Sequence, residues 1–352
     1  MTRQTNEVRQ AGIIANQFLA PTTIASVKRI GSGHIHSTFR IASETGHALI
    51  LQRLNQSVFP DLTNLIANHL HLQSRWAGEE SPAIPRLVPS NAGEYLVRDA
   101  DGHVWRAMTC LEGRCLDIPA SPDEVHAAAQ AFGIFARRVN LPEPLLLQPS
   151  LADFHNTPLR LHHLKQAAEH DPRRRRAECE AELATLLEYA HLATPPQSVF
   201  AMERRPLRVI HADTKINNLL YDPEDRTRVS GIVDLDTVMP GWLAFDFGDL
   251  VRTAAVDTAE DEVDLSRIHL RPDYYDAILE GYREGCGDLL RPDESLSLGN
   301  GALVITYEVA LRFLTDHLLG DIYFHTARPN HNLIRARTQI ALLEALLEYR
   351  HQ

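Results

Sequence analysis

Ile210-His-Ala-Asp-Thr-Lys-Ile-Asn-Asn-Leu-Leu220 places several reactive side chains between two short apolar runs. Short runs of this kind, bounded by polar residues, predict strands at both ends of the stretch. The polar residues then form a connecting loop, whose backbone can aim Asp213, Lys215 and Asn218 toward one another. This loop carries the strongest chemical signal in the chain.

A third apolar run, Val229 to Val233, ends in Asp234-Leu-Asp236. The turn-forming residues Pro223-Glu-Asp-Arg226 precede it, so the run predicts a strand that returns to the end of the hairpin that bears the loop. Strand alternation turns Asp236 to the same face as Asp234. We expect both carboxylates to face the same volume as Asn218. Asp236 then has either a metal or substrate role or a structural one.

Phosphoryl transfer from a nucleotide needs the groups that this loop provides. A carboxylate accepts the proton of the substrate hydroxyl, and hard oxygen ligands hold the Mg²⁺ that bridges the phosphates. The pattern His-x-Asp-x-x-x-x-Asn matches the catalytic loop of kinases, with Ala212 where protein kinases have arginine. We predict Asp213 as the base and Asn218 with Asp234 as Mg²⁺ ligands. Lys215 either offsets charge on the transferred group or is a solvated loop residue.

The composition limits the class of protein. The chain has 352 residues, 44% of them apolar, which is enough for a sizeable core in each of two domains. A formal net charge of −11 argues against a nucleic-acid partner, because nucleic acids are bound through clustered Lys and Arg. No apolar stretch approaches the roughly 18 residues that span a bilayer. We expect a soluble, cytoplasmic protein without a membrane partner.

The order of the predicted elements indicates two lobes. In the first third we expect strands at 25–30, 37–42 and 48–54, a helix at 62–76, and a hairpin at 95–98 and 104–111. Later we expect helices at 122–138, capped by Ser121, at 174–193 and from 273 onward, with short strands between 207 and 233. The predicted fold is α+β, with a small sheet-rich nucleotide-binding lobe over residues 1–111 and a larger, mostly helical lobe for catalysis and substrate binding over 112–352.

With these residues, the chain resembles the aminoglycoside phosphotransferase and choline kinase superfamily, and most closely its N-acetylhexosamine 1-kinases. The resemblance implies a two-lobed fold like that of protein kinases, and ATP- and magnesium-dependent phosphorylation of a sugar at its anomeric hydroxyl. One fold serves many substrates, so the fold itself does not select the sugar. The segments that carry the resemblance are Gly31-Ser-Gly-His-Ile-His36, Leu51-Gln-Arg-Leu-Asn55, Val58-Phe59, His211-Ala-Asp-Thr-Lys-Ile-Asn-Asn218, Val233-Asp-Leu-Asp-Thr-Val-Met-Pro-Gly241, Phe245-Asp-Phe-Gly-Asp249 and Leu311-Arg-Phe-Leu-Thr-Asp-His317.

The nucleotide side departs from the related kinases. Gly31 and Gly33 lie in a turn whose backbone amides are candidate phosphate contacts, although a short Gly-x-Gly also suits an ordinary hairpin. Gln52 stands where the related kinases have a phosphate-contacting Lys or Arg, and the following helix has no obvious Glu partner. The neighbouring Arg53 is a candidate replacement for that cation.

Candidate acceptor ligands are Asp236, His34, His36 and Arg312. In the Gly-rich turn, His36-Ser37 replaces the Asn-Asp expected in the hexosamine kinases, which indicates a shift in substrate choice. Arg312 lies at helical spacing between Glu308 and Asp316. This spacing predicts a surface ion-pair ladder, whereas the resemblance implies that Arg312 binds sugar hydroxyls.

Residues near the loop indicate how it is held in place. Asp246 and Asp249 follow a Pro240-Gly241 turn, and we expect them to accept hydrogen bonds from the backbone of the catalytic loop. We expect His211 to brace the same loop by hydrogen bonding rather than to exchange protons. The loop is therefore predicted to be rigid.

Two other functions stay open. A kinase for another small alcohol, such as an aminoglycoside, choline or homoserine, would use the same catalytic residues. A nucleotide-binding pseudokinase is suggested by Gln52 and the missing Glu, although Asp213, Asn218 and Asp234 are all present. The sequence also leaves the oligomeric state open.

Overall fold

The computed structural model describes residues 3–19, 24–30, 35–76, 78, 81–193 and 207–351. The chain divides into two compact units, Met1–Glu112 and Gly113–Gln352. The N-terminal unit combines one sheet with two helices, and the C-terminal unit is mostly helical with two short β-pairs. The chain is therefore α+β. Within the described residues, no helix is both long and apolar enough to cross a bilayer.

The N-terminal unit is built around an antiparallel sheet with strand order β1-β2-β3-β6-β4, in which β5 also pairs with β6. Most strands and helix α2 lie where the sequence predicts them, whereas α1 and β4 were not predicted. Helix α2 begins where Asp61 Oδ1 accepts the Asn64 N–H at 2.9 Å. The elements are α1 (Arg3–Ala15), β1 (Ile24–Arg29), β2 (Ser37–Ser43), β3 (Ala48–Arg53), α2 (Leu62–Gln73), β4 (Leu87–Val88), β5 (Val97–Arg98) and β6 (Val104–Thr109).

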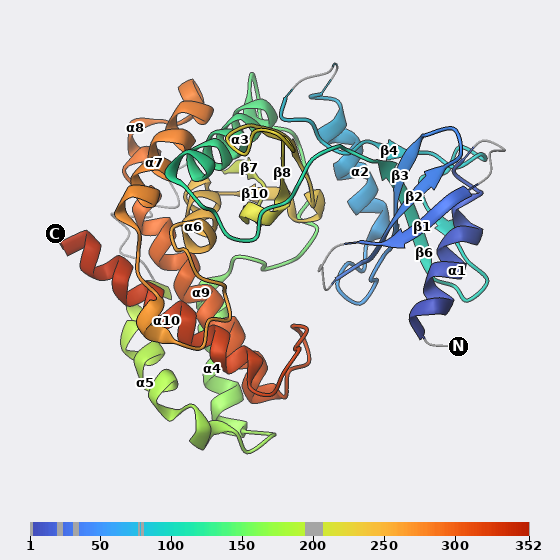
Figure 1. Ribbon diagram of the computed structural model, residues 1–352. Helices are drawn as coiled ribbons and strands as arrows, with labels where there is room; N and C mark the ends of the chain where they lie inside the picture. Colours follow the sequence, from blue (N-terminus) through green and yellow to red (C-terminus); the bar gives the residue numbers. More distant parts are fainter. Residues whose placement is uncertain are drawn as a thin grey trace. The chain divides into compact units, whose positions relative to one another are not determined.

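Each face of this sheet is covered by one helix (Figure 1). Because side chains alternate along a strand, Leu49 and Leu51 of β3 pack toward α1, where they join a buried cluster that includes Phe18. Ile50, between them, packs on the other face against a cluster that includes Ile66 of α2. A side chain's position along β3 therefore decides which of the two faces it reaches.

The C-terminal unit holds the remaining helices and the pairs β7–β10 and β8–β9. The predicted cap of α3 is confirmed, since Ser121 Oγ accepts the Glu124 N–H at 3.3 Å. Helices α4 and α6 and strand β10 were not predicted. The elements are α3 (Pro122–Asn140), α4 (Thr157–His170), α5 (Glu180–Glu188), β7 (Arg208–Ile210), β8 (Leu219–Tyr221), β9 (Val229–Ile232), β10 (Met239–Gly241), α6 (Leu243–Ala254), α7 (Pro272–Cys286), α8 (Pro292–Ser295), α9 (Leu298–Leu319) and α10 (His331–His351).

The single helix predicted over residues 174–193 is wrong. The structure has α5 flanked by two 3₁₀ turns, Arg176–Glu178 and Tyr189–Ala193. Cys179, with φ −134° and ψ 24°, departs from helical geometry and separates the first turn from α5. Apolar spacing alone did not reveal this break.

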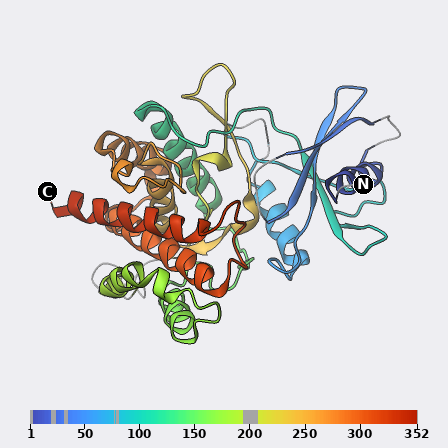
Figure 2. The ribbon, with the colours of Figure 1, turned by 60° about the horizontal axis from the view of Figure 1, so that its bottom comes forward.

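Helices α9 and α10 run side by side, as Figures 1 and 2 show, and α6 packs on α9. The contact between α6 and α9 is close because two glycines meet there. A Cβ added to Gly301 of α9 would overlap the backbone carbonyl of Ala244, and one added to Gly248 of α6 would overlap the Gly301 carbonyl. Only glycine fits at these positions.

We expect Gly301→Ala to lower the free energy of unfolding by about 2–3 kcal/mol, because a side chain forced into a tight contact costs more than the gain of about 1 kcal/mol in helix propensity. Gly299→Ala, on the same helix, is the matched control, since its Cβ would meet only the Tyr275 hydroxyl at 3.1 Å. Urea unfolding of both variants measures the difference. Equal stability of the two variants would contradict this packing.

Candidate active site

The catalytic loop connects β7 to β8. Hydrogen bonds join the end of this loop to the end of β9. Leu219 pairs with Ile232, and the Val233 N–H donates to the Asn218 carbonyl at 2.9 Å. Asp234, the next residue, has a left-handed backbone with φ 59° and an exposed side chain. The structure therefore brings the backbones of Asn218 and Asp234 to the same end of the β8–β9 pair.

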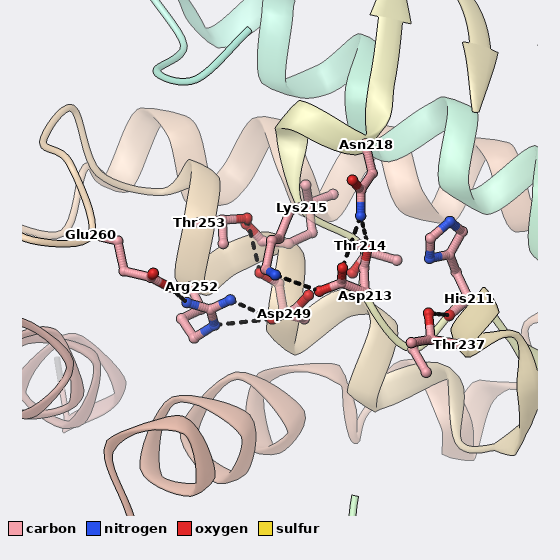
Figure 3. A network of polar contacts seen from close by, with 12 residues as sticks. His211, Asp213, Thr214, Lys215, Asn218, Thr237, Asp249, Arg252, Thr253 and Glu260 are labelled. Atoms are coloured by element: carbon pink, nitrogen blue, oxygen red, sulfur yellow. Dashed lines mark hydrogen bonds and ion pairs between the residues drawn. The ribbon is translucent and has the colours of Figure 1, made fainter. Parts of the chain in front are cut away.

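Asp213 lies at the centre of a short polar cluster (Figure 3). The Lys215 Nζ is 2.8 Å from Asp213 Oδ1. The Asn218 Nδ2 donates to Asp213 Oδ2 at 3.0 Å and to the Asp213 carbonyl at 2.8 Å. Among the described residues, each carboxylate oxygen of Asp213 therefore has one side-chain partner, and the Lys215 ammonium group is directed at Asp213 although its side chain is 39% exposed.

The charges of this cluster support one another. Burial by itself would raise the pKa of Asp213, but the charge and hydrogen bond of Lys215, together with smaller contributions that include the Asn218 hydrogen bond, lower that pKa to about 2. Burial by itself would lower the pKa of Lys215, but the carboxylates of Asp213 and Asp249 raise it well above its ordinary value. Asp213 and Lys215 are therefore both charged at neutral pH.

Asp246 holds the start of the catalytic loop, as predicted. Its Oδ2 accepts the His211 N–H at 2.8 Å and its Oδ1 accepts the Ala212 N–H at 2.7 Å, while its backbone carbonyl accepts the Thr214 hydroxyl at 2.5 Å. The His211 ring Nε2 contacts the Val233 carbonyl at 3.2 Å, and burial lowers the pKa of His211. Neutral His211 thus donates to Val233 and braces the loop.

Asp249 has a different role from the predicted one. Its Oδ1 accepts from Arg252 Nε at 2.9 Å and Nη2 at 2.8 Å, and Arg252 also pairs with Glu260 at 2.6 Å. Asp249 and Arg252 are both buried. The carboxylate of Asp249 therefore belongs to an ion-pair network behind Lys215 (Figure 3), not to the backbone of the loop.

Arg312 lies within a group of aromatic rings. Its guanidinium carbon is 5.1 Å from the ring centre of Phe154, 5.6 Å from Tyr323 and 5.4 Å from Phe324. Its Nη2 is 3.4 Å from the Tyr323 hydroxyl. This arrangement stabilises a cation over ring faces and leaves guanidinium edges for other partners.

The predicted surface ion-pair ladder on α9 is wrong, because Glu308 and Asp316 are both buried. The carboxylate of Asp316 accepts the backbone N–H groups of residues 322, 323 and 324 at 2.8–2.9 Å, and that of Glu308 pairs with His155. Asp316 thereby fixes the loop that brings Tyr323 and Phe324 to Arg312.

Gln52 lies on the α2 face of the N-terminal sheet, between a threonine and a buried arginine. Its Oε1 accepts from Arg106 Nε at 2.9 Å and Nη2 at 2.6 Å, and its Nε2 donates to the Thr38 hydroxyl at 3.1 Å. Arg106 is only 2% exposed. The guanidinium of Arg106, on the neighbouring strand β6, thus lies beside Gln52, which takes the position of the expected cation.

Arg53 lies on the opposite face of the sheet. Its Nη2 is 2.9 Å from Glu7 of α1 and 3.2 Å from the Ser37 hydroxyl. The structure therefore does not bring Arg53 together with Gln52, and a ligand on the Gln52 face does not meet Arg53.

The remaining predicted ligands each have surroundings of their own. His36 Nδ1 accepts the Asn55 N–H at 3.0 Å, and its ring centre is 5.3 Å from that of Phe59. The prediction that strand alternation turns Asp236 to the same face as Asp234 is wrong, because β9 ends at Ile232 and a 3₁₀ turn, Leu235–Thr237, follows. Asp236 is buried, 3% exposed, whereas Asp234 is exposed. Gly31, Gly33 and His34 lie outside the described residues.

The oxygen atoms around Asn218 suit a magnesium ion as ligands. Both contacts of the Asn218 Nδ2 are acceptors, which sets the orientation of the amide, and the Oδ1 makes no hydrogen bond to the described residues. Asp234 adds a carboxylate at the same end of the β-pair. Amide and carboxylate oxygens are the ligands that Mg²⁺ prefers.

Sequence patterns did not identify Arg106, His155 or the rings around Arg312. Arg106 alone had a signal, since it is a charged residue inside the apolar strand Val-Trp-Arg-Ala-Met. The ring of Phe154 belongs to a connection without regular structure, and its approach to α9 depends on the tertiary fold. These residues become visible only in the folded chain.

Comparison with known proteins agrees with this architecture. Residues 26–288 match the model of the phosphotransferase enzyme family. The fold is similar to that of an aminoglycoside phosphotransferase from Alicyclobacillus acidocaldarius (TM-score 0.59, 15% identity, 96% of each chain covered). It is also similar to that of a microcompartment-associated aminopropanol kinase (TM-score 0.61, 15% identity, 96% of this chain and 97% of the other).

A third similar structure is the amicoumacin kinase hAmiN, in complex with AMP-PNP, Ca²⁺ and Ami (TM-score 0.58, 14% identity, 97% of this chain and 96% of the other). The predicted kinase-like fold, with a sheet-rich N-terminal part and a helical C-terminal part, is confirmed. The family match covers well over half of the chain. This chain therefore belongs to the phosphotransferase enzyme family and transfers a phosphoryl group to a hydroxyl acceptor.

Proposed function

We propose that the chain is an ATP- and magnesium-dependent kinase that phosphorylates the anomeric hydroxyl of an N-acetylhexosamine or a related sugar. The observation that carries the proposal is the contact of Asp213 with Lys215 and Asn218, at 2.8 and 3.0 Å. One carboxylate, one cation and one oriented amide in a single loop are the groups that phosphoryl transfer to a hydroxyl requires.

Asp213 is the proposed base. Its carboxylate orients the acceptor hydroxyl and takes its proton as the new O–P bond forms, while Lys215 offsets negative charge on the transferred group. Asn218 Oδ1 and the Asp234 carboxylate are the proposed ligands of magnesium, which supplies positive charge to the nucleotide phosphates. Gln52, with Arg106 beside it, is the proposed nucleotide contact of the N-terminal unit.

The groups around Arg312 favour a neutral acceptor with several hydroxyl groups. The rings of Phe154 and Tyr323 offer apolar faces for the C–H side of a sugar, and the guanidinium edge offers donors to hydroxyl oxygens. Arg160 Nη2 binds the carbonyl of Phe154 at 3.0 Å, and burial followed by the charge of Arg312 lowers the pKa of Arg160. Two guanidinium groups near Phe154 oppose a cationic acceptor, which disfavours aminoglycosides and choline.

A substrate panel tests the proposal. ATP with MgCl₂ is offered with N-acetylglucosamine, N-acetylgalactosamine, kanamycin, choline and homoserine, and phosphate position in each product is read by ³¹P NMR. We expect a sugar 1-phosphate, and no product when EDTA exceeds the magnesium. Phosphorylation of an amino alcohol alone would overturn the sugar assignment. ATP binding without turnover of any acceptor would indicate a pseudokinase.

We expect Arg312→Met to raise the acceptor KM about 10- to 100-fold while the KM for ATP stays within about threefold, since one charge-assisted hydrogen bond contributes about 1.5–3 kcal/mol. Arg271→Met is the matched control, because Arg271 also lies over a tyrosine ring, 4.4 Å from Tyr274, but pairs with Asp257 and Asp273 at the surface. Steady-state kinetics with N-acetylglucosamine measure both variants. An unchanged acceptor KM in Arg312→Met would exclude Arg312 from the acceptor site.

A further inference from the structure

His155 connects helix α9 to the catalytic loop through both of its ring nitrogens. Its Nδ1 is 3.0 Å from Glu308 Oε1, and its Nε2 is 3.1 Å from the carbonyl oxygen of Ala212, the residue before Asp213. The other oxygen of Glu308 accepts the Thr157 hydroxyl at 2.6 Å. Glu308 is fully buried and the His155 side chain is nearly so. Neither contact of His155 is therefore a surface ion pair.

Ala212 needs to be held because its backbone is strained. It has φ 63°, in the left-handed region that a residue with a Cβ adopts only at a cost of about 1–2 kcal/mol. Its N–H donates to Asp246 Oδ1 at 2.7 Å, and its carbonyl accepts from His155. One buried group thus fixes each side of Ala212, and the second of the two fixed peptide units leads directly into Asp213.

We propose that His155 is a positioning residue for phosphoryl transfer, held as an imidazolium by Glu308 so that its Nε2–H fixes the Ala212 carbonyl and thereby the direction of the Asp213 side chain. This role rests on the proposed function of Asp213. The two residues have different roles: Asp213 contacts the acceptor hydroxyl, whereas His155 contacts neither the acceptor nor the nucleotide.

The contacts of His155 favour the doubly protonated ring. A carbonyl oxygen can only accept, and the Glu308 carboxylate, which already accepts from Thr157, also accepts, so both ring nitrogens donate. Burial lowers the pKa of His155, but the hydrogen bond and charge of Glu308 outweigh it, followed by the charge of Asp249, and the pKa is raised. The rings of Phe154 and Phe245 also pack against His155, and Asp246 is a further titratable group whose charge interacts with it.

Two variants separate the two contacts. In His155→Asn the amide nitrogen takes the place of Nδ1, which keeps the Glu308 contact and loses the Ala212 contact. In His155→Gln the amide nitrogen takes the place of Nε2, which keeps a donor to Ala212. With N-acetylglucosamine, ATP and magnesium we expect His155→Asn to lower kcat about 10- to 100-fold with both KM values within about threefold, and His155→Gln to recover most of that loss.

Two measurements do not depend on turnover. In full-length protein labelled with ¹⁵N-histidine, we expect both ring N–H groups of His155 at pH 7, with the shifts of an imidazolium. We also expect faster hydrogen exchange of the His211 and Ala212 amides in His155→Asn than in His155→Gln. These readouts apply even where N-acetylglucosamine is not phosphorylated, so failure of the proposed function is told apart from failure of this inference.

A neutral His155 ring at pH 7 would overturn the proposal. So would equal behaviour of the two variants in exchange, or in kcat where turnover is seen, because a residue with a merely structural role would lose stability without distinguishing the Ala212 contact from the Glu308 contact. Urea unfolding of both variants corrects each comparison for the fraction that is unfolded.

Discussion

Asp213→Asn is expected to lower kcat about 1,000-fold, within the range of 10²–10⁴ that a positioned proton acceptor contributes. The asparagine has nearly the same shape, but its amide cannot take the proton of the acceptor hydroxyl. The amide oxygen of the new asparagine still accepts from Lys215. Its amide nitrogen faces the Asn218 Nδ2, which is also a donor, so one hydrogen bond of the loop is lost as well. The loss therefore falls on the chemical step.

The low pKa of Asp213, about 2, makes it a weak base, and this decides how it acts. A carboxylate that stays ionised throughout the neutral range orients the hydroxyl and takes its proton late, as the O–P bond forms, rather than in advance. Orientation then matters as much as basicity. Asp213→Glu, which keeps the charge but moves it by one methylene, is expected to lose at least about 100-fold in kcat.

Asp225→Asn is the matched control for Asp213→Asn, because Asp225 lies in the turn of the same β8–β9 pair, exposed and bonded to Thr227. Circular dichroism and thermal unfolding show that the variants are folded, and initial rates on the acceptor found by the panel give kcat. Turnover of Asp213→Asn within tenfold of the unchanged protein would remove Asp213 from the role of base.

The sequence was most informative where the site is local. Asp213, Lys215 and Asn218 lie within six residues, so a loop between two short strands is enough to bring them together, and the structure shows that contact. Asp234 needed only the next strand of the same hairpin. The short range of these contacts explains why spacing and residue type were sufficient.

Contacts between distant segments were beyond the reach of sequence patterns. Glu308 was expected to serve a surface ladder or a cleft, yet its partner is His155, 153 positions away. Gln52 and Arg106 meet because strands β3 and β6 pair in one register, which no local pattern specifies. Helix α1 was missed because it has few apolar residues. These residues pack against a sheet whose strands come later in the sequence.

Asp249 shows a further limit. It lies three residues beyond Asp246 on α6, so both were expected to serve the loop, but the buried guanidinium of Arg252 takes the Asp249 carboxylate. A carboxylate goes to the strongest donor that it can reach, and a charged guanidinium is stronger than a backbone amide. Residue type and helical spacing do not rank these donors.

Asp246→Asn is expected to lower the free energy of unfolding by about 1–3 kcal/mol at pH 5 and kcat by about tenfold or more. Asp246 is fully buried, and its two oxygens each accept one backbone N–H at the start of the catalytic loop. The amide nitrogen of asparagine leaves one of these N–H groups without an acceptor, at about 1–3 kcal/mol. The strained Ala212 is then less firmly held, so the effect reaches Asp213.

The dependence on pH distinguishes this account from a simple loss of packing. Burial raises the pKa of Asp246 to about 7, although the His211 and Ala212 N–H groups lower it, whereas an unfolded aspartate has a pKa of about 3.9. The folded chain therefore binds this proton more tightly, and the contribution of Asp246 to the free energy of unfolding falls as pH rises from about 4 to about 7. The stability gap between the unchanged protein and Asp246→Asn should be larger at pH 5 than at pH 8.

Urea unfolding of both proteins at pH 5 and pH 8 measures that gap. Asp273→Asn is the matched control, since Asp273 also lies in the first turn of a helix, α7, but is exposed and pairs with Arg271 at the surface. Its effect should stay within about 1 kcal/mol. Asp246→Asn and Asp273→Asn with equal effects on stability and kcat would show that the loop does not depend on the buried carboxylate. A gap of equal size at pH 5 and pH 8 would show instead that Asp246 is already ionised at pH 5 in the folded chain, with its two backbone donors outweighing burial.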